Sequence, residues 1–320
     1  MPSAGAPPIR RVILPVPFPL KTANVYLVAG PEGTVLIDTG FYMPDAWSIL
    51  AQGLGSFTSR WGPLRAIVLT HHHPDHVGMA GRLQEHYRVP VLTSPGEARL
   101  IVRVWTASAP EASLEFYGVH GMPAPVLSDV AEEHDWIFKT IPPFPDLSEV
   151  DPDHPAVIAG VSFAPLIMPG HSPAHLCLLH APSGTLVAGD LLLPRITPNI
   201  GWYPYAGPDP LGDFLESLDR VDRIAVEEAL PGHGAAITDV KTRIAELRAH
   251  HAARLAAVCA ILDGGVRTGY EVAQRLFGSD LSSQESRLAL VETLAHLEHL
   301  RRRGRVAVTR RGSRPVYQSR

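Results

Sequence analysis

Short runs of β-branched and aliphatic residues alternate along the chain with segments whose apolar positions repeat at helical spacing. The runs predict strands at Arg11–Leu14, Asn24–Val28, Thr34–Ile37, Ala66–Thr70, Val89–Leu92, Val157–Ile167, Leu176–Leu179 and Thr185–Val187. Helices are expected between or after them at Asp45–Leu54, Met79–Tyr87 and Leu211–Val221. This alternation predicts an α/β or α+β sandwich with its helices outside the sheets.

Two details sharpen the expected topology. A Gly-Pro-Glu-Gly segment at residues 30–33 separates the second and third runs and predicts a hairpin turn. Residues 66–70 read Ala-Ile-Val-Leu-Thr without polar alternation, which predicts a strand buried on both faces.

Two segments stand apart from the alternating pattern. Residues from about 97 to 154 are helical and loop-like, and we interpret them as an insertion over one face of a main domain at 1–250. Residues 251–320 predict two short helices and a β-hairpin, which indicate a small winged-helix-like domain. A long helix at Thr238–Leu262 carries an apolar stripe, which can pack on its own sandwich or on a second copy in a homodimer.

The composition agrees with a folded protein of two domains. At about 150 residues per domain, 320 residues suggest two, and 45% hydrophobic residues allow a sizeable core. A net charge of −4 argues against a wholly basic nucleic-acid binder but permits a local basic patch. Cys177 and Cys259 are too few for a disulfide framework, which favours a cytoplasmic setting. The apolar run Val12–Leu20 is short and rich in proline, so no membrane association is expected.

Four metal-ligand side chains follow Thr70, at the end of the strand predicted to be buried. Residues 71–76 read His-His-His-Pro-Asp-His. Neutral imidazole and carboxylate bind zinc, and they also bind iron or manganese. One tetrahedral ion cannot use all four comfortably, so the spacing favours two ions. His71 and His73 would bind the first, and Asp75 and His76 the second.

Three further strand ends supply the missing ligands. Each has a glycine beside one ligand-type residue, where glycine lets the backbone turn sharply and approach an ion. His171 follows Gly170, Asp190 follows Gly189 and His233 follows Gly232. His171 would complete the first site and His233 the second, and Asp190 can bridge the ions. We therefore predict seven ligands for two Zn²⁺ ions, with iron or manganese as alternatives.

Other histidines near these motifs have other interpretations. The alternation of an H-x-H motif turns His72 away from the ions, so we expect it behind the ligands or at the solvent. His175 and His180 are interpreted as structural, with contact to the site as an alternative for His175.

These motifs resemble those of metallo-β-lactamase-fold hydrolases over roughly residues 13–250. The resemblance implies an α+β fold, an αββα sandwich with a metal site along one edge. It carries the family's ligand roles onto His71, His73, Asp75, His76, His171, Asp190 and His233. It also implies that Asp38, within Ile-Asp-Thr-Gly at 37–40, is buried and supports the metal loop.

The departures from the family pattern are small. Ser172 replaces the commoner Thr and Ala174 the commoner Gly. Asp190 stands where the best-known zinc β-lactamases use cysteine, which argues against antibiotic hydrolysis and fits the thioesterase, lactonase and RNase branches. Residues 285–318 resemble the C-terminal winged helix of the lactamase-like endoribonuclease branch, which glyoxalase-II-like bacterial hydrolases share. The helical domain with which glyoxalase II holds glutathione has no counterpart, which puts glutathione thioesters in doubt.

The preferred functional interpretation is a hydrolase of small molecules. Two ions sharing a bridging hydroxide would attack a thioester, ester or lactone. Asp75 would also orient the hydroxide, and Tyr203 is a candidate for holding substrate or an oxyanion, or else a core aromatic. Aromatic residues of the insertion could wall a substrate pocket or pack helices: Trp105, Phe116, Tyr117, Trp136 and Phe138.

A metal-dependent endoribonuclease is the alternative, with the winged helix holding RNA. The last twenty residues contain eight arginines and no Asp or Glu, and such a patch can meet phosphates. The arginines can equally form a solvated wing and tail: Arg301, Arg302, Arg303, Arg305, Arg310, Arg311, Arg314 and Arg320. A DNA-binding regulator would leave the metal ligands unexplained.

Overall fold

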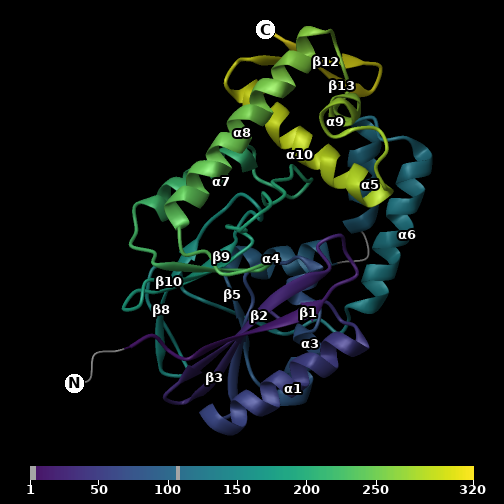
Figure 1. The fold of residues 1–320 in the computed structure, drawn as a ribbon. Coiled ribbons are helices and arrows are strands. Elements are labelled where there is room, and N and C mark those ends of the chain that lie inside the picture. Colours follow the sequence, from purple (N-terminus) through teal and green to yellow (C-terminus); the bar gives the residue numbers. More distant parts are fainter. Residues whose placement is uncertain (1–4, 106–108) are drawn as a thin grey trace.

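Two β-sheets face each other in the computed structural model, which describes residues 5–105 and 109–320, and helices cover both outer surfaces (Figure 1). The first sheet has the order β1 (Ile9–Pro15), β2 (Thr22–Gly30), β3 (Gly33–Ile37), β4 (Leu64–Val68), β5 (Val91–Thr93) and β6 (Leu147–Glu149). Strands β1 to β3 are antiparallel, and β3 to β6 are parallel. The predicted hairpin is confirmed, because Gly30 pairs with Gly33 across its turn.

The second sheet has the order β11 (Glu228–Pro231), β10 (Thr185–Gly189), β9 (Leu176–His180), β8 (Val161–Ile167) and β7 (Ala156–Ile158). Only the pair β10–β11 is parallel among these strands. The prediction of one strand over residues 157–167 is wrong. Ala159 and Gly160 have φ values of 50° and 78°, so the chain turns there and separates β7 from β8.

Side chains of the first sheet alternate between two cores, as the period of two in a strand requires. In β2, Val25 and Leu27 face the outer core, whereas Tyr26 and Val28 face the core between the sheets. In β4, Ile67 and Val68 divide in the same way and are fully buried, which confirms the prediction for this strand.

Four helices complete the sandwich. Helices α1 (Pro44–Trp61) and α3 (Ala80–Tyr87) cover the outer face of the first sheet. Helices α7 (Pro210–Asp222) and α8 (Val240–Asp263) cover the second. The apolar stripe predicted on α8 packs against its own chain, since Ile244 and Leu247 are buried beneath α7 and the sheet.

The segment predicted as an insertion contains three helices and one edge strand. Helices α4 (Pro95–Val104), α5 (Ala109–Val119) and α6 (Ala124–Thr140) precede β6, which pairs with β5. Residues 106–108 of the predicted insertion lie outside the described residues. The short helix α2 (Pro74–Val77) carries part of the His-rich motif.

The C-terminal part contains α9 (Gly269–Phe277), α10 (Ser283–Arg302), β12 (Val306–Arg311) and β13 (Arg314–Ser319). Capping boxes start both helices, at Thr268 with Glu271 and at Ser282 with Glu285. Helix α10 is buried on nearly every side, because it packs against α6, α7, α8, α9 and β12 (Figure 1). The domain boundary predicted at residue 250 falls inside α8, which is continuous.

Both cysteines are free. Within residues 5–105 and 109–320, no helix is long and apolar enough to cross a membrane.

Candidate metal centre

The predicted ligands meet at one edge of the sandwich, beyond the ends of β4, β8, β10 and β11. Parallel strands bring their carboxyl ends to the same edge, which explains the convergence of β4 with its neighbours and of β10 with β11. The two sheets are also joined there by the Leu176 N–H, which donates to Thr70 O at 2.8 Å. In β2, Asn24 Nδ2 and the Tyr26 hydroxyl donate to Pro231 O and hold the loop that carries His233.

The His-rich loop turns directly from β4 into α2. His73 is the N-cap residue of α2 and Pro74 its first residue, a position that suits proline because no helical partner exists for its nitrogen. This turn lets His71 and His73 face one group of ligands while Asp75 and His76 face another.

The ligand atoms form two sets of three, and a third, overlapping set connects them. His71, His73 and His171 form one, and Asp75, His76 and His233 the other. A third set, His71 with His76 and Asp190, joins them. Within each set the ligand atoms lie within 4.8 Å of one another. The structure therefore brings all seven predicted ligand residues together.

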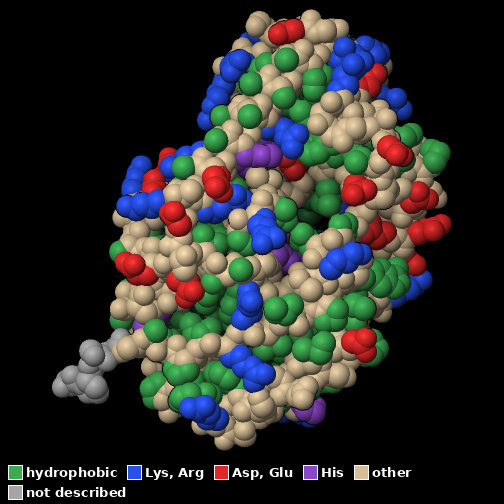
Figure 2. Space-filling view, in the orientation of Figure 1, with side chains coloured by type: hydrophobic (Ala, Val, Ile, Leu, Met, Phe, Trp, Pro, Cys, Tyr) green, Lys and Arg blue, Asp and Glu red, His purple; other side chains and the backbone are tan. Residues whose placement is uncertain are grey.

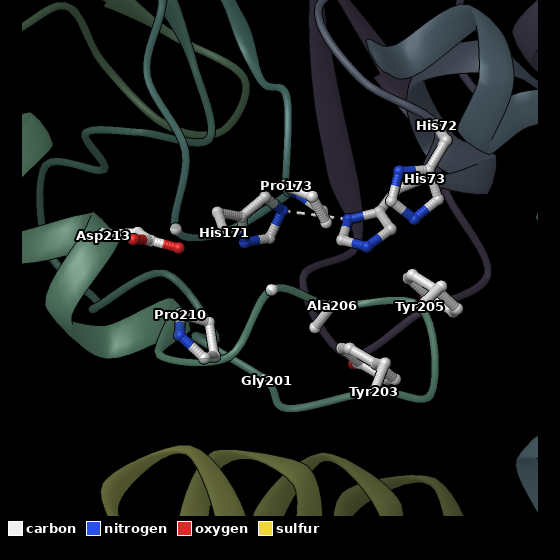
Figure 3. Close-up of a pocket in the computed structure, with 12 residues that line it drawn as sticks. His72, His73, His171, Pro173, Gly201, Tyr203, Tyr205, Ala206, Pro210 and Asp213 are labelled. Atoms are coloured by element: carbon white, nitrogen blue, oxygen red, sulfur yellow. Dashed lines mark hydrogen bonds between the residues drawn. The ribbon is translucent and has the colours of Figure 1, made fainter. Parts of the chain in front are cut away.

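In the first triad the nitrogen atoms nearly touch. His171 Nε2 lies 2.9 Å from His73 Nδ1 and 3.2 Å from His71 Nε2, and the other pair is 3.0 Å apart. Nitrogen ligands around one tetrahedral ion at about 2.0–2.1 Å are separated by roughly 3.4 Å. Figure 3 shows His73 and His171 pointing toward each other. The triad therefore has the spacing of three ligands around one ion.

Hydrogen bonds engage the Nδ1 atoms of two predicted ligands. Thr70 donates its hydroxyl hydrogen to Asp38 Oδ2 and so accepts from His71 Nδ1 at 2.9 Å. His76 Nδ1 donates to the same carboxylate oxygen at 2.8 Å. Nδ1 of each ring thus carries a hydrogen, which leaves Nε2 of His71 and His76 as the atom available to an ion.

Backbone carbonyls orient two other ligands in the same way. His171 Nδ1 donates to Asn199 O at 2.9 Å, and His233 Nδ1 donates to Thr22 O at 2.6 Å. Nδ1 of each ring therefore carries a hydrogen, and Nε2 is the atom that faces the cluster.

Two carboxylates, Asp75 and the neighbouring Asp190, surround the histidines of the second triad. His233 Nε2 lies 3.3 Å from Asp75 Oδ2 and 3.4 Å from Asp190 Oδ2. Burial would raise the pKa of Asp190, but His233 and His76 hold it well below its ordinary value. Burial would lower the pKa of His76, yet Asp38 and the two ligand carboxylates raise it to about 9. The site thus attracts positive charge, which protons or divalent ions can supply.

The electrostatic effect at the first triad is the reverse of that at the second. Burial and the neighbouring histidines lower the pKa of His71 and of His73 well below its ordinary value, which favours the neutral form of both rings. Neutral imidazole is the form that binds metal ions.

Buried polar atoms that lack a hydrogen-bond partner indicate whether these residues suit two metal ions. Among the described residues, His76 Nε2, His233 Nε2 and Asp190 Oδ1 are buried without a hydrogen-bond partner. Buried polar atoms are ordinarily satisfied, so such a group needs a partner. All three atoms face the cluster, and a pair of divalent ions would satisfy them.

The glycines beside the ligands serve two different purposes. Gly170 and Gly189 have φ values of 141° and 47°, which residues with a Cβ rarely adopt. Gly232 is needed for space, since a Cβ there would collide with Asp190 Oδ1 and approach His76 Cε1 to 2.7 Å.

Glu97, which was not predicted from the sequence, holds the loop from behind. It is fully buried and accepts hydrogen bonds from the His72 N–H, from His72 Nδ1 and from the Ser172 hydroxyl. His72 therefore lies behind the ligands, although it also lines the neighbouring cavity. His175 contacts the site, because its ring stacks on His71 and its Nε2 accepts from the Asp190 N–H at 3.1 Å.

His180 stays outside the cluster, where its Nδ1 lies 2.7 Å from the Ser183 hydroxyl oxygen.

A cavity of about 370 Å³ adjoins the ligands. Figure 2 shows the molecule hollowed below α10, with hydrophobic side chains along the opening. The sandwich supplies the metal ligands, whereas α5, α6 and α10 supply much of the wall. Its apolar lining includes Phe18, Leu20, Trp105, Ile137, Phe138, Leu193, Ile196 and Leu288.

Tyr203 lines this cavity beside the histidines and also belongs to a buried hydrophobic cluster. Its ring stacks on that of Tyr205 at 5.2 Å, and both tyrosines lie on a loop next to His73 and His171 (Figure 3). Burial raises the pKa of Tyr203 to about 12, so its hydroxyl stays protonated at neutral pH. Trp105, Tyr117 and Phe138 of the predicted insertion also line the cavity, but Phe116 packs on His120 and Trp202. Trp136 is 45% exposed and packs on Phe41.

Comparisons with known proteins agree with this arrangement. The family model described as the Metallo-beta-lactamase superfamily matches residues 19–233. A second model, the metallo-beta-lactamase-like C-terminal domain, matches residues 255–317. The "Probable metallo-hydrolase YqjP" of Bacillus subtilis (strain 168) is 29% identical over 300 residues, which cover 90% of each chain.

Solved structures give the same result. A metallo-beta-lactamase family protein from Thermus thermophilus is 34% identical, with a TM-score of 0.86 and coverage of 98% of both chains. A beta-lactamase domain protein from Burkholderia ambifaria is 27% identical, with a TM-score of 0.86 and coverage of 98% of this chain and 93% of that one.

The fold and its edge of histidines and aspartates thus define a metallo-hydrolase. The chain belongs to the metallo-beta-lactamase superfamily and carries that superfamily's C-terminal domain. The predicted sandwich and the prediction of a hydrolytic enzyme are confirmed.

Proposed function

We propose that the protein hydrolyses a small thioester, ester or lactone with two divalent metal ions. His71, His73 and His171 would hold the first ion, and Asp75, His76 and His233 the second. Asp190 would bridge them, because its carboxylate lies 3.6 Å from His171 Nε2 and 3.4 Å from His233 Nε2. The observation that carries the proposal is the convergence of these seven side chains beside one apolar cavity, which five of them line.

The bound ions, zinc or else iron or manganese, would polarise the substrate carbonyl and lower the pKa of a shared water from about 15.7 toward 7. The chain's own groups would then direct the reaction. Asp75 lines the cavity and would accept a hydrogen bond from the attacking water, which would orient that water toward the carbonyl. Addition of water breaks the acyl bond and yields a carboxylic acid with an alcohol or a thiol.

Tyr203 would act as a neutral hydrogen-bond donor. Its hydroxyl keeps its proton, and it borders the same cavity as the ligands. A donor of this kind can hold a substrate oxygen or stabilise negative charge that develops on it.

The cavity wall favours small acyl compounds. Its lining is mainly aliphatic and aromatic, so an acyl chain gains by leaving water there.

The free thiols of Cys177 and Cys259 are consistent with the reducing, cytoplasmic setting expected from the sequence.

An endoribonuclease is the second candidate, and the exposed arginines of the C-terminal hairpin are the observation in its favour. We infer a winged helix from the order α9, α10, β12 and β13. Arg310, Arg311 and Arg314 are exposed on its hairpin. In contrast, Arg301 pairs with Glu298 and Arg303 with Asp209, which reduces the charge available to RNA.

The test combines metal analysis with a substrate panel. Protein purified without chelators should contain about two equivalents of a transition metal by inductively coupled plasma mass spectrometry. It should hydrolyse at least one class among acyl-CoA, acyl-glutathione, 4-nitrophenyl esters and lactones. Asp190→Ala should lose at least one metal equivalent and about 100-fold or more in kcat/KM.

Asp280→Ala is the matched control, because this aspartate is exposed on a loop between α9 and α10. It should keep both metal content and activity. Cleavage of single-stranded RNA without turnover of any acyl compound would favour the second candidate. A metal-free protein with no turnover would refute both.

A further inference from the structure

A polar cluster lies in the wall of the cavity, away from the strands that carry the metal ligands. Arg287 projects from α10, His134 from α6, and Tyr117 and Ser113 from α5. All of them line the same cavity as the metal ligands, and so does Tyr203. Helix α6 contacts both α5 and α10, so the fold itself brings these side chains together (Figure 1).

Arg287 is incompletely satisfied in this position. Its Nε is buried without a hydrogen-bond partner among the described residues. The hydroxyls of Tyr117 and Tyr203 interact with its guanidinium, but both are neutral groups. A guanidinium in an apolar wall is costly without an anionic partner.

A second unsatisfied nitrogen belongs to the same cluster. His134 Nδ1 is buried without a partner in the described part of the chain. Burial lowers the pKa of His134 to about 4, with Arg287 adding to the effect, so this ring is neutral at pH 7. The cluster therefore offers one permanent cation together with neutral hydrogen-bonding groups.

Glu133 is the carboxylate that acts on Arg287, and it is already engaged. Its Oε1 accepts a hydrogen bond from Gln284 Nε2 at 2.6 Å. Burial raises its pKa, and Arg287 opposes this rise. The negative charge beside Arg287 disfavours a dianion such as phosphate more than a monoanion, because repulsion grows with charge.

We propose that Arg287 receives a carboxylate carried by the substrate, so that the enzyme acts on acyl compounds with an apolar chain and a second, free carboxylate. The planar fork of arginine matches a carboxylate in two parallel hydrogen bonds. The acyl group would reach the metal ligands while the carboxylate lies against α10. This assignment rests on the proposed hydrolase function and defines its substrate class.

Half-esters of dicarboxylic acids test the proposal directly. The 4-nitrophenyl half-esters of succinate, adipate and suberate are compared with 4-nitrophenyl hexanoate, which has no free carboxylate. The metal-loaded enzyme should prefer at least one half-ester over hexanoate by about 10-fold or more in kcat/KM. Arg287→Gln should lower kcat/KM for that half-ester about 100-fold, because it removes the charge partner of the substrate carboxylate. The value for hexanoate should fall much less, so that the preference for the half-ester is lost.

Two further variants distinguish carboxylate binding by Arg287 from a general effect of substitution on the fold. Arg287→Lys keeps the charge without the fork and should retain part of the preference. Arg254→Gln is the matched control, since Arg254 is half-buried on α8 over the Phe277 ring and does not line the cavity. It should leave the preference unchanged.

Calorimetric binding of monomethyl adipate, which has one free carboxylate, and of dimethyl adipate, which has none, separates this proposal from the hydrolase function. The wild-type protein should bind monomethyl adipate more tightly, and Arg287→Gln should abolish the difference. If no ester is hydrolysed, this binding difference still decides the role of Arg287. Equal binding of the two compounds by folded wild-type protein would overturn the proposal, and so would an equal loss for half-ester and hexanoate in Arg287→Gln.

Discussion

Asp38 Oδ2 accepts a hydrogen bond from His76 Nδ1 at 2.8 Å, which fixes the ring of a predicted ligand from behind. Asp38 Oδ1 accepts from the Thr70 N–H, so the same carboxylate also holds the end of the strand that leads into the His-rich loop. Asp38 has a φ of 57°, a conformation in which Asp and Asn are more frequent than most residues. This residue therefore links the backbone of the first sheet to the chemistry of the second triad.

Asp38→Asn tests this link. Asparagine tolerates the left-handed backbone, but its amide NH₂ cannot accept the hydrogen of His76 Nδ1. We expect the affinity for the second metal ion to fall about 10- to 100-fold with the fold retained. Competition with a chromophoric chelator measures the affinity, and circular dichroism checks the fold. Unchanged affinity for both ions would contradict this role.

Gly232→Ala tests the space beside the bridging carboxylate. The added Cβ would collide with Asp190 Oδ1, and the preceding carbonyl is held by β2, so the loop cannot easily yield. Loss of one metal equivalent and about 100-fold or more in activity is expected. Gly55→Ala on α1 is the control, because nothing lies within 4 Å of a Cβ there. That substitution should leave metal content intact and slightly stabilise the helix.

Glu97→Gln tests the support behind the loop. Glu97 is fully buried and accepts hydrogen bonds from His72 and Ser172. An amide in its place presents an NH₂ group to hydrogen-bond donors, so the free energy of unfolding should fall by about 2–4 kcal/mol. Urea unfolding measures this change. Glu216→Gln, at an exposed position on α7, should keep its free energy of unfolding within about 0.5 kcal/mol of wild type. An equal loss of stability in both variants would contradict a special role for Glu97.

The buried carboxyl group of Glu292 on α10 should make the free energy of unfolding depend on pH. Burial raises its pKa to about 7 in the folded protein, against an ordinary value of 4.5, although Arg254 and Asn199 oppose the rise. The folded state therefore binds more protons than the unfolded state between these values, and stability falls as the pH rises from 4.5 toward 7. The contribution reaches about 3 kcal/mol at most.

Glu292→Gln should remove this dependence. Unfolding free energies of both proteins, measured in chelator at pH values below and above this window, isolate it, since metal binding is then absent from both. The wild type should lose more stability than the variant as the pH rises. Parallel curves would show that Glu292 has an ordinary pKa.

The seven predicted ligands could be found from the sequence because each follows a strand in a short local motif. Glu97 has no such motif. It stands in the first turn of α4, where an acidic residue is expected to serve the N-cap, and Ser94 does cap that turn. The Glu97 side chain instead points to His72 and Ser172, which only the packing of α4 against the sandwich brings near.

Arg287 was missed for a related reason. Its helix was expected, but periodicity shows only which face of a helix is apolar. It does not show that α10 lies beside α6 and closes the cavity next to histidines some two hundred residues earlier. The break between β7 and β8 depends on a positive φ at Ala159, which alanine seldom adopts, so the apolar pattern there read as one strand.

The carbonyl oxygens that orient His171 and His233 have a consequence for biosynthesis. Thr22 lies near the start of the chain, and its partner His233 follows 211 residues later. A nascent chain must therefore release nearly all of the sandwich from the ribosome before the ring of His233 acquires its final orientation. Binding of the second ion would then follow the folding of the sandwich, and incompletely synthesised chains would bind that ion poorly.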